Sequence, residues 1–251
     1  MFSVDKLKAG LNTKTIGNKI VYLEETDSTN LDAWENYSYS EGTIWITDNQ
    51  IKGRGRRHNK WLSAKTKSLT FSFILKPKIK LDQLSLLPLL VGVSIIEGIY
   101  ESTFIQAGLK WPNDIMLNKK KMGGILVESK IISDTLVLVV GIGLNINESV
   151  KDISMHNLNT STSLNVYSKE FQNRELILSE ILNRFEILYN DGWNSVVPKW
   201  INYCIHNGSV VSFNTDNGKH NGIFKGITED GQAEIQINDK IENFLAGVIS
   251  I

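Results

Sequence analysis

Residues 135–147 read Thr-Leu-Val-Leu-Val-Val-Gly-Ile-Gly-Leu-Asn-Ile-Asn, a nearly continuous apolar segment that ends in polar side chains. A short apolar run of this kind is typical of a strand that is buried on both faces. Gly141 and Gly143 remove the side chains from alternate positions, which clears one face of the predicted strand. The cleared face could admit a ligand or a packed neighbour, and the sequence does not distinguish the two.

The chain on either side of this segment carries further strand and helix patterns. In residues 68–75 small polar and large apolar side chains alternate, which predicts a strand with one buried face. Apolar spacing predicts a buried packing helix over about residues 85–101 and an amphipathic helix over residues 175–190. The remaining expectations are strands at residues 19–24, 42–47 and 123–128 and one ending at Lys110, short helices after Asn30 and at residues 196–204, and irregular chain over residues 148–169.

The pattern changes from Gly208 onward. Short alternating runs are separated there by Asp-Asn-Gly, Glu-Asp-Gly and Asn-Asp turns. These runs predict a small all-β barrel or sandwich of about 45 residues. We therefore expect a domain boundary near His206, with a larger domain of residues 1–206 and a small one of residues 207–251.

Composition limits the classes of protein to consider. Lysine plus arginine and aspartate plus glutamate number 27 each, so the chain as a whole has no reason to seek nucleic acid or an anionic membrane. One cysteine, Cys204, excludes an internal disulfide and a cysteine-cluster metal site. The first ten residues lack an apolar signal region, and the longest apolar run, residues 86–96, contains Pro88 and falls short of a membrane span. We therefore expect a cytoplasmic protein.

Residues 52–61, Lys-Gly-Arg-Gly-Arg-Arg-His-Asn-Lys-Trp, form what we call the basic loop. Its first nine residues hold five cations and no acid. It is either a solvated turn or a loop that closes over an anion, because glycines let backbone N–H groups approach a phosphate and arginine forks match its oxygens. The loop has Gly-x-Gly spacing, but a strand rather than a helix follows it, which excludes a dinucleotide-binding Rossmann motif.

Of three other polar segments, two have two readings each. Ser28, Thr29 and Asn30 could cap the following helix, or their hydroxyl and N–H groups could also bind a polar ligand. Residues 110–114, Lys-Trp-Pro-Asn-Asp, could be a turn with an exposed lysine, or Trp111 could hold the Lys110 side chain in place. Residues 118–121 are expected to form a hairpin turn whose charges are solvated.

Five segments, taken in order, resemble the motifs of biotin–protein ligases, and the resemblance runs from about residue 19 to the end of the chain. It implies an α+β fold: a mixed, largely antiparallel sheet with packed helices, as in class II aminoacyl-tRNA synthetases and biotin ligases, followed by a small SH3-like β-barrel. The five segments are residues 27–30, 53–61, 110–114, 123–128 and 141–147.

The resemblance implies a ligase that joins biotin to ATP as biotinyl-5′-adenylate and then to a lysine of a biotin carboxyl carrier protein. Fixed cations and Mg²⁺ would bring the two anions together, and a lid would exclude water. The implied catalytic residues are Lys110 and Arg54, and the Mg²⁺ ligands are not assigned. The implied biotin-binding residues are Ser28, Thr29, Asn30, Gln50, Arg54, Gly55, Arg56, Lys110, Gly124 and Gly143; those for ATP or the adenylate are Arg54, Arg56, Trp61, Lys110, Asn113 and Asn145.

Two departures from the family pattern bear on these roles. Many members have glycine and arginine where this chain has His58 and Asn59, so phosphate contact from position 59 is in doubt and His58 is expected to be exposed. Only about 20 residues precede the first predicted strand, too few for the helix-turn-helix domain of members that double as repressors. We therefore expect no DNA partner and no membrane partner. Some members are dimers, which leaves a homodimer open here.

Two rival functions remain at this stage. A lipoate–protein ligase has a similar fold and also makes an acyl-adenylate, although the basic loop and residues 110–114 favour biotin. A nucleic-acid-binding module could use Arg54, Arg56, Arg57 and Trp61 for phosphate contact and stacking. The zero net charge and the single basic loop argue against that module.

Overall fold

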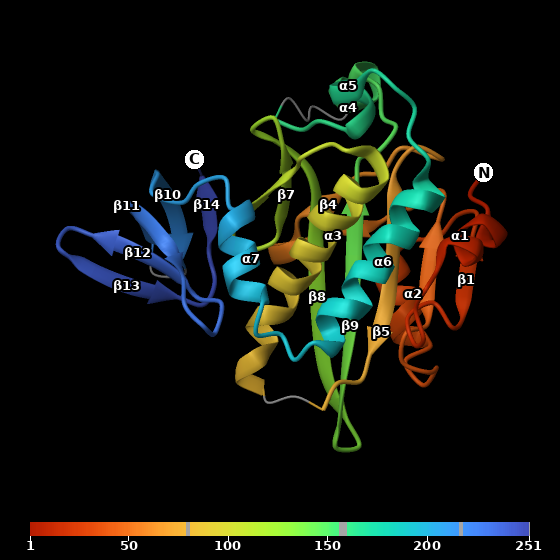
Figure 1. Cartoon of the computed structure of the whole chain (residues 1–251), viewed down its shortest axis with the longest axis horizontal. Coiled ribbons are helices and arrows are strands. Elements are labelled where there is room, and N and C mark those ends of the chain that lie inside the picture. The colour runs from red at the N-terminus through yellow and green to blue at the C-terminus, as the bar shows by residue number, and fades with distance from the viewer. Residues whose placement is uncertain (79–80, 156–159, 216–217, 251) are drawn as a thin grey trace.

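The computed structural model describes residues 1–78, 81–155, 160–215 and 218–250, which form an α+β protein with a large and a small sheet (Figure 1). The large sheet has the strand order β1-β2-β5-β9-β8-β7-β6. β1 and β2 are parallel and the other neighbours are antiparallel, which confirms a mixed, largely antiparallel sheet. The strands are β1 (Ile20–Leu23), β2 (Ile44–Thr47), β5 (Leu69–Leu75), β6 (Gly108–Lys110), β7 (Asp114–Leu117), β8 (Lys120–Ile132) and β9 (Thr135–Leu144).

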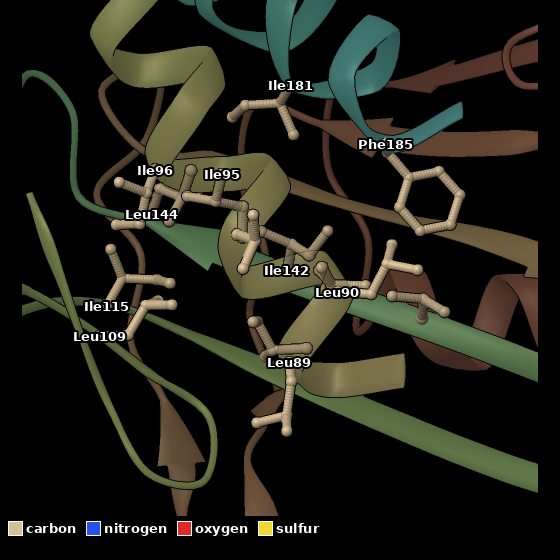
Figure 2. Close-up of a cluster of buried hydrophobic side chains, with 14 of the residues drawn as sticks. Leu89, Leu90, Ile95, Ile96, Leu109, Ile115, Ile142, Leu144, Ile181 and Phe185 are labelled. Atoms are coloured by element: carbon tan, nitrogen blue, oxygen red, sulfur yellow. The ribbon is translucent and has the colours of Figure 1, made fainter. Parts of the chain in front are cut away.

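Two long helices cover one face of this sheet. α3 (Leu87–Thr103) has Pro88 in its first turn and follows a 3-10 helix, η2 (Leu81–Leu86), whereas α6 (Arg174–Asn190) packs along α3. Figure 2 shows α3 side chains between the strands on one side and Ile181 and Phe185 of α6 on the other. The helical stretch Gln83–Thr103 has 21 residues and is long and apolar enough to cross a membrane, contrary to expectation, but 67% of an 18-residue window within it is buried.

The opposite face of the sheet is partly covered by α2 (Thr29–Glu35). Ala33 of this helix packs on Trp45, Ile74, Val137 and Val139 in a second, smaller cluster. Every residue of β5 is buried, so the prediction of one buried face was wrong. Ser72 forms hydrogen bonds with Thr29 and Asn30 of α2, whereas Thr70 lines a pocket.

Several short helices differ from expectation. α1 (Val4–Gly10), which the sequence patterns did not indicate, packs on α6. The prediction of irregular chain over residues 148–169 was wrong, because α4 (Val150–Met155) and α5 (Leu164–Ser168) lie there, while residues 156–159 are outside the described part. The Ser163 hydroxyl caps α5 by accepting from the Val166 N–H at 3.0 Å, a local signal that apolar spacing does not include. The predicted C-terminal helix is α7 (Val196–Tyr203).

The small sheet is antiparallel, with the strand order β13-β12-β11-β10-β14. It lies at the β6 end of the large sheet (Figure 1), and Phe213, Phe224 and Ile235 belong to the same continuous core as α3. The Trp111 indole N–H donates to the Gly231 carbonyl at 3.2 Å, which ties the two sheets together. The strands are β10 (Val210–Thr215), β11 (Gly218–Ile227), β12 (Ala233–Ile237), β13 (Lys240–Phe244) and β14 (Val248–Ser250).

Glu148, just beyond β9, is a carboxyl group buried to 4% exposure. The Ser68 hydroxyl donates to its Oε1, but Oε2 has no hydrogen-bond partner among the described residues. Burial raises the pKa of Glu148 to about 7 from its usual 4.5, with a smaller contribution from the Asp152 charge and in opposition to the Ser68 hydrogen bond. The buried carboxyl is therefore most easily accommodated when it is protonated.

We predict that Glu148 makes the fold less stable as the pH rises. Between pH 4.5 and about 7 the unfolded chain loses the Glu148 proton while the folded chain keeps it, so the free energy of unfolding falls across this window and then levels off. The free energy of unfolding should fall by about 3 kcal/mol across this window because of Glu148, and Glu148→Gln should abolish that fall. Urea unfolding of both proteins from pH 4.5 to 8 measures the difference. Other titrating groups cancel in that difference, and parallel curves for the two proteins would contradict the prediction.

Candidate active site

The floor of the candidate site is made by alternate residues of three neighbouring strands. Gly143 of β9 lies opposite Thr70 of β5 and opposite Gly124 of β8. One step along, Gly141 lies opposite Ser72 and Leu126. These positions share one sheet face with Val137 and Val139, which α2 covers. The floor therefore begins at the edge of the area that α2 covers on this face.

The two glycines of β9 each make room for a side chain that packs over the strand. A Cβ atom at Gly141 would lie 2.0 Å from Asn30 Oδ1, and one at Gly143 would lie 2.3 Å from Trp61 Cε2. The sequence left open whether the space above these glycines admits a ligand or a packed neighbour. The structure places a packed side chain above each of them. Those neighbours, Asn30 and Trp61, themselves line the pocket.

A chain of hydrogen bonds connects the first turn of α2 to the floor. Gln50 Oε1 accepts from the Thr29 backbone N–H at 2.9 Å, and the Thr29 hydroxyl lies 2.7 Å from the Ser72 hydroxyl. Ser72 in turn donates to Asn30 Oδ1 at 2.6 Å. Ser28 occupies the N-cap position but makes no side-chain capping bond. Capping alone thus does not account for these polar residues.

Two buried polar atoms of the pocket have no hydrogen-bond partner within the described residues: Trp61 Nε1 and Thr70 Oγ1. Leaving such a group unpaired costs about 1–3 kcal/mol. An indole N–H can only donate, whereas a hydroxyl can both donate and accept. These two atoms are suited to a ligand that carries polar groups into an otherwise largely apolar floor.

The walls of the pocket are strongly basic. Six cationic side chains and one carboxylate, that of Asp114, line it within the part of the chain that the structure describes. Burial lowers the pKa of Arg56, and the neighbouring Arg57 charge lowers it further, so an anion beside Arg56 would relieve an unfavourable environment. The six cations are Arg54, Arg56, Arg57, Lys60, Lys110 and Lys121.

Asp114 holds two of these cations in place. Lys110 Nζ lies 3.1 Å from one of its carboxylate oxygens, and Lys121 Nζ pairs with the other. Lys110 also donates to the backbone carbonyl of Ile249 at 3.3 Å, so the small sheet helps to position it. Gly247, Val248 and Ile249 line the pocket as well, which the sequence did not predict.

The expectation that the hairpin charges are solvated was wrong for Lys121. Residues 118–120 are exposed, but Lys121 is half-buried and lines the pocket with Gly124. In a regular strand, residues three apart point to opposite faces. The pairing of β7 with β8 is shifted between Ile115 and Met116, and this irregularity brings Lys121 to the Gly124 side. An irregularity of this kind leaves no signal in the polar pattern of a turn.

The basic loop is a folded hairpin over the pocket. It consists of β3 (Gly53–Arg54), η1 (Arg56–His58) and β4 (Lys60–Trp61), and β3 pairs with β4. The Gly55 N–H donates to the Asn59 carbonyl at 2.7 Å, and Arg56 Nη1 donates to Asn113 Oδ1 at 3.0 Å. Asn59 lines the pocket, whereas the expectation about the His58 side chain lies outside the described residues.

Arg54 reaches across the mouth of the pocket to β8. Its Nη2 donates to Glu128 Oε2 at 3.1 Å, and the two residues also line an adjoining cleft on the outer side of the basic loop. At the start of the loop Lys52 pairs with Asp27 at 2.7 Å, but this pair is exposed. The contacts of Arg54 and Arg56 thus attach the loop to opposite sides of the pocket.

The structure brings together all but one of the residues that the resemblance implied. Asn145 does not line the pocket, because its side-chain amide donates to the Thr162 carbonyl at 3.0 Å. Thr70, Ser72 and Lys121 take part in the site although the sequence did not single them out for it. The implied residues that line the pocket are Ser28, Thr29, Asn30, Gln50, Arg54, Gly55, Arg56, Trp61, Lys110, Asn113, Gly124 and Gly143.

Comparison with known proteins is consistent with this geometry. Residues 21–145 match the model of the biotin/lipoate A/B protein ligase family. The chain is 32% identical over 256 residues to the bifunctional ligase/repressor BirA of Bacillus subtilis (strain 168). The matched region covers 99% of this chain and 79% of that protein. It is similar in structure to the biotin protein ligase from Aquifex aeolicus in complex with biotin and ATP, with a TM-score of 0.80, 33% identity, and coverage of 93% and 98% of the two chains.

We predict that Gly143→Ala displaces Trp61 and loosens the basic loop. The new methyl group would overlap the indole, and overpacking costs about 1–3 kcal/mol, so tryptic cleavage after Arg56 and Arg57 should become about tenfold faster. Gly124→Ala is the matched control, because its methyl group would meet nothing nearer than 3.6 Å.

A double variant separates this cause from a general loss of structure. If the methyl group acts by displacing the indole, Gly143→Ala should add nothing to the cleavage rate of Trp61→Ala. Additive effects, or equal cleavage of the Gly143→Ala and Gly124→Ala proteins, would contradict the prediction.

Proposed function

This chain belongs to the biotin/lipoate A/B protein ligase family, and we propose that within it the chain acts as a biotin–protein ligase. The observation that supports this most directly is the pocket itself: among the described residues six cations line it, and two of its buried polar atoms, Thr70 Oγ1 and Trp61 Nε1, have no hydrogen-bond partner. A reaction between two anions needs such a concentration of fixed positive charge. The named relatives are biotin ligases, and one of them was solved with biotin and ATP.

In the first step the biotin carboxylate attacks the α-phosphate of ATP. The new bond gives biotinyl-5′-adenylate, and pyrophosphate leaves with the electron pair of the broken P–O bond. Lys110, Arg54 and Arg56 would hold the carboxylate and the α-phosphate, and Lys121 would join them from the other side of Asp114. Their charges offset the repulsion between the two anions and stabilise the negative charge that develops on the phosphate.

In the second step the amine of a carrier lysine attacks the acyl carbon of the adenylate. An amide bond forms, the C–O bond to phosphate breaks, AMP leaves with that electron pair, and the amine nitrogen loses a proton to solvent. Lys110 and Arg56 would stabilise the leaving phosphate. The basic loop and the Trp61 indole cover the pocket, so water has little access to the reactive anhydride before the amine arrives.

The polar end of biotin would lie on the floor, beside Thr29, Asn30 and Gln50. The unpaired Thr70 hydroxyl is buried on the same face and could donate or accept there. Ser28 would contribute from the start of α2, and Gly55, Gly124 and Gly143 would offer backbone or space, since a Cβ at Gly143 would overlap the Trp61 indole that lines the pocket.

The nucleotide would lie beside Trp61 and Asn113 at the other end of the pocket. Mg²⁺ enters with ATP as part of the substrate and commonly takes phosphate oxygens, waters and one or two carboxylates. Within the described residues no group of three or more His, Cys, Asp or Glu could hold a metal, so the phosphates would supply most ligands and Asp114 is the nearby carboxylate. Asn145 supports the pocket from outside, through Thr162, and we propose no direct contact for it.

The partner that this reaction requires is a biotin carboxyl carrier protein or domain, such as that of acetyl-CoA carboxylase. ATP and such carriers meet in the cytoplasm, which is the location we propose. We also propose that residues 1–206 form the ligase domain and that residues 207–251 form an SH3-like barrel; the five-stranded antiparallel order supports the second point. The zero net charge of the chain disfavours a nucleic-acid-binding module.

A pyrophosphate-release assay tests the proposed function. Pyrophosphate should appear only when biotin and MgATP are both present, and an isolated carrier domain should then gain biotin on one lysine, detected by mass spectrometry. Lipoate replaces biotin in a parallel reaction. Release with lipoate but not with biotin would identify a lipoate ligase, and salt-sensitive RNA binding without either activity would identify the rival module.

We predict that Lys110→Ala and Lys121→Ala each lower the rate of adenylate formation about 10²–10³-fold, because each removes a cation from the reacting phosphate. Lys119→Ala is the matched control from the exposed hairpin tip and should retain the wild-type rate. Thermal unfolding checks that all three variants are folded. Wild-type turnover in folded Lys110→Ala protein would exclude the role proposed for Lys110.

A further inference from the structure

One carboxylate oxygen connects the two ends of the candidate site. Oε2 of Glu128, on β8, accepts hydrogen bonds from Asn30 Nδ2 at 2.8 Å, Trp34 Nε1 at 3.2 Å and Arg54 Nη2 at 3.1 Å. Asn30 and Trp34 lie in α2, whereas Arg54 lies in the basic loop. Three donors from two separate elements therefore depend on a single acceptor atom.

Two of the three residues held by Glu128 would serve different parts of the substrates. The Asn30 amide is fixed at both ends, because Ser72 donates to its oxygen at 2.6 Å and its nitrogen donates to Glu128. Its orientation over Gly141 is thus set. A guanidinium carries five N–H donors, so Arg54 can keep its bond to Glu128 and still donate to a carboxylate or a phosphate.

We propose that Glu128 is a positioning residue, which orients Asn30 for the polar end of biotin and Arg54 for the adenylate. The inference rests on the proposed function, in that it assigns Asn30 and Arg54 to two substrates. Glu128 lines the adjoining cleft rather than the pocket itself, and it takes no part in bond making. Its carboxylate couples the position of the loop to that of the first turn of α2.

The energy of the ion pair is not its main contribution. The side chains of Arg54 and Glu128 are 39% and 29% exposed, and pairs of this kind add little to stability. Orientation is different, because a guanidinium without a fixed acceptor samples many rotamers before it meets an anion. The loss of Glu128 should therefore affect substrate affinity more than it affects unfolding.

Two substitutions of Glu128 separate its two roles. Glu128→Gln keeps an oxygen that can accept from Asn30 and Trp34, but it removes the charge that holds Arg54. The KM for ATP should rise about two- to fivefold and the KM for biotin by less, because Asn30 keeps its acceptor and so keeps the polar end of biotin in place. Glu128→Ala removes the acceptor for all three donors, so both KM values should rise, by about tenfold. Ser129→Ala, at the next and exposed position of β8, is the control.

A double-variant cycle tests the connection to Arg54. If Glu128 acts on ATP through Arg54, Glu128→Gln should not raise the KM for ATP further in an Arg54→Gln protein. Additive effects, or an equal rise of both KM values in Glu128→Gln, would overturn the positioning role.

The outcome can be kept apart from that of the proposed function. A wild-type protein that shows no biotin-dependent pyrophosphate release would refute the function. The rate of tryptic cleavage after Arg56 would then still test whether Glu128 holds the basic loop. Cleavage that is about two- to fivefold faster in Glu128→Gln than in wild type supports the connection between loop and sheet. Equal cleavage rates would overturn it.

Discussion

The site depends on the absence of two side chains from the central strand. Because Gly141 and Gly143 have no Cβ, Asn30 and Trp61 approach the β9 backbone to distances that any other residue would block. Asn30 brings the first turn of α2 onto the sheet, and Trp61 brings down the end of the basic loop. The pocket is the space left between these two side chains. Its position is therefore set by backbone exposure on one face of one strand.

A second constraint is the charge of the walls. The chain has no net charge, yet six cations line one pocket beside a single carboxylate among the described residues. Like charges held this close repel one another: burial lowers the pKa of Arg56 most, and the neighbouring Arg57 charge lowers it further. Asp114 offsets part of this repulsion for Lys110 and Lys121, and Glu128 does so for Arg54. The remaining positive potential is what an anionic ligand would neutralise.

The sequence predicted the parts of the fold and site that depend on local patterns. The alternation in β5, the apolar run of β9 and the helical spacing of α3 each follow from a periodicity, and all three elements are present. The burial of both faces of β5 does not follow, because it depends on α2 packing there from a distant part of the chain. Lys121 was missed for a related reason: a shift in strand pairing changed its face, and no residue type marks that shift.

The small sheet belongs to the site in a way that a domain boundary drawn from sequence hides. Trp111 donates to Gly231 and Lys110 donates to Ile249, so two adjacent residues at the end of β6 are both held by the same sheet. Lys110 is flexible by itself, with four rotatable bonds in its side chain. With Asp114 on one side and the Ile249 carbonyl on the other, its ammonium group is confined to the pocket. The proposed catalytic lysine therefore takes its position from contacts with both sheets.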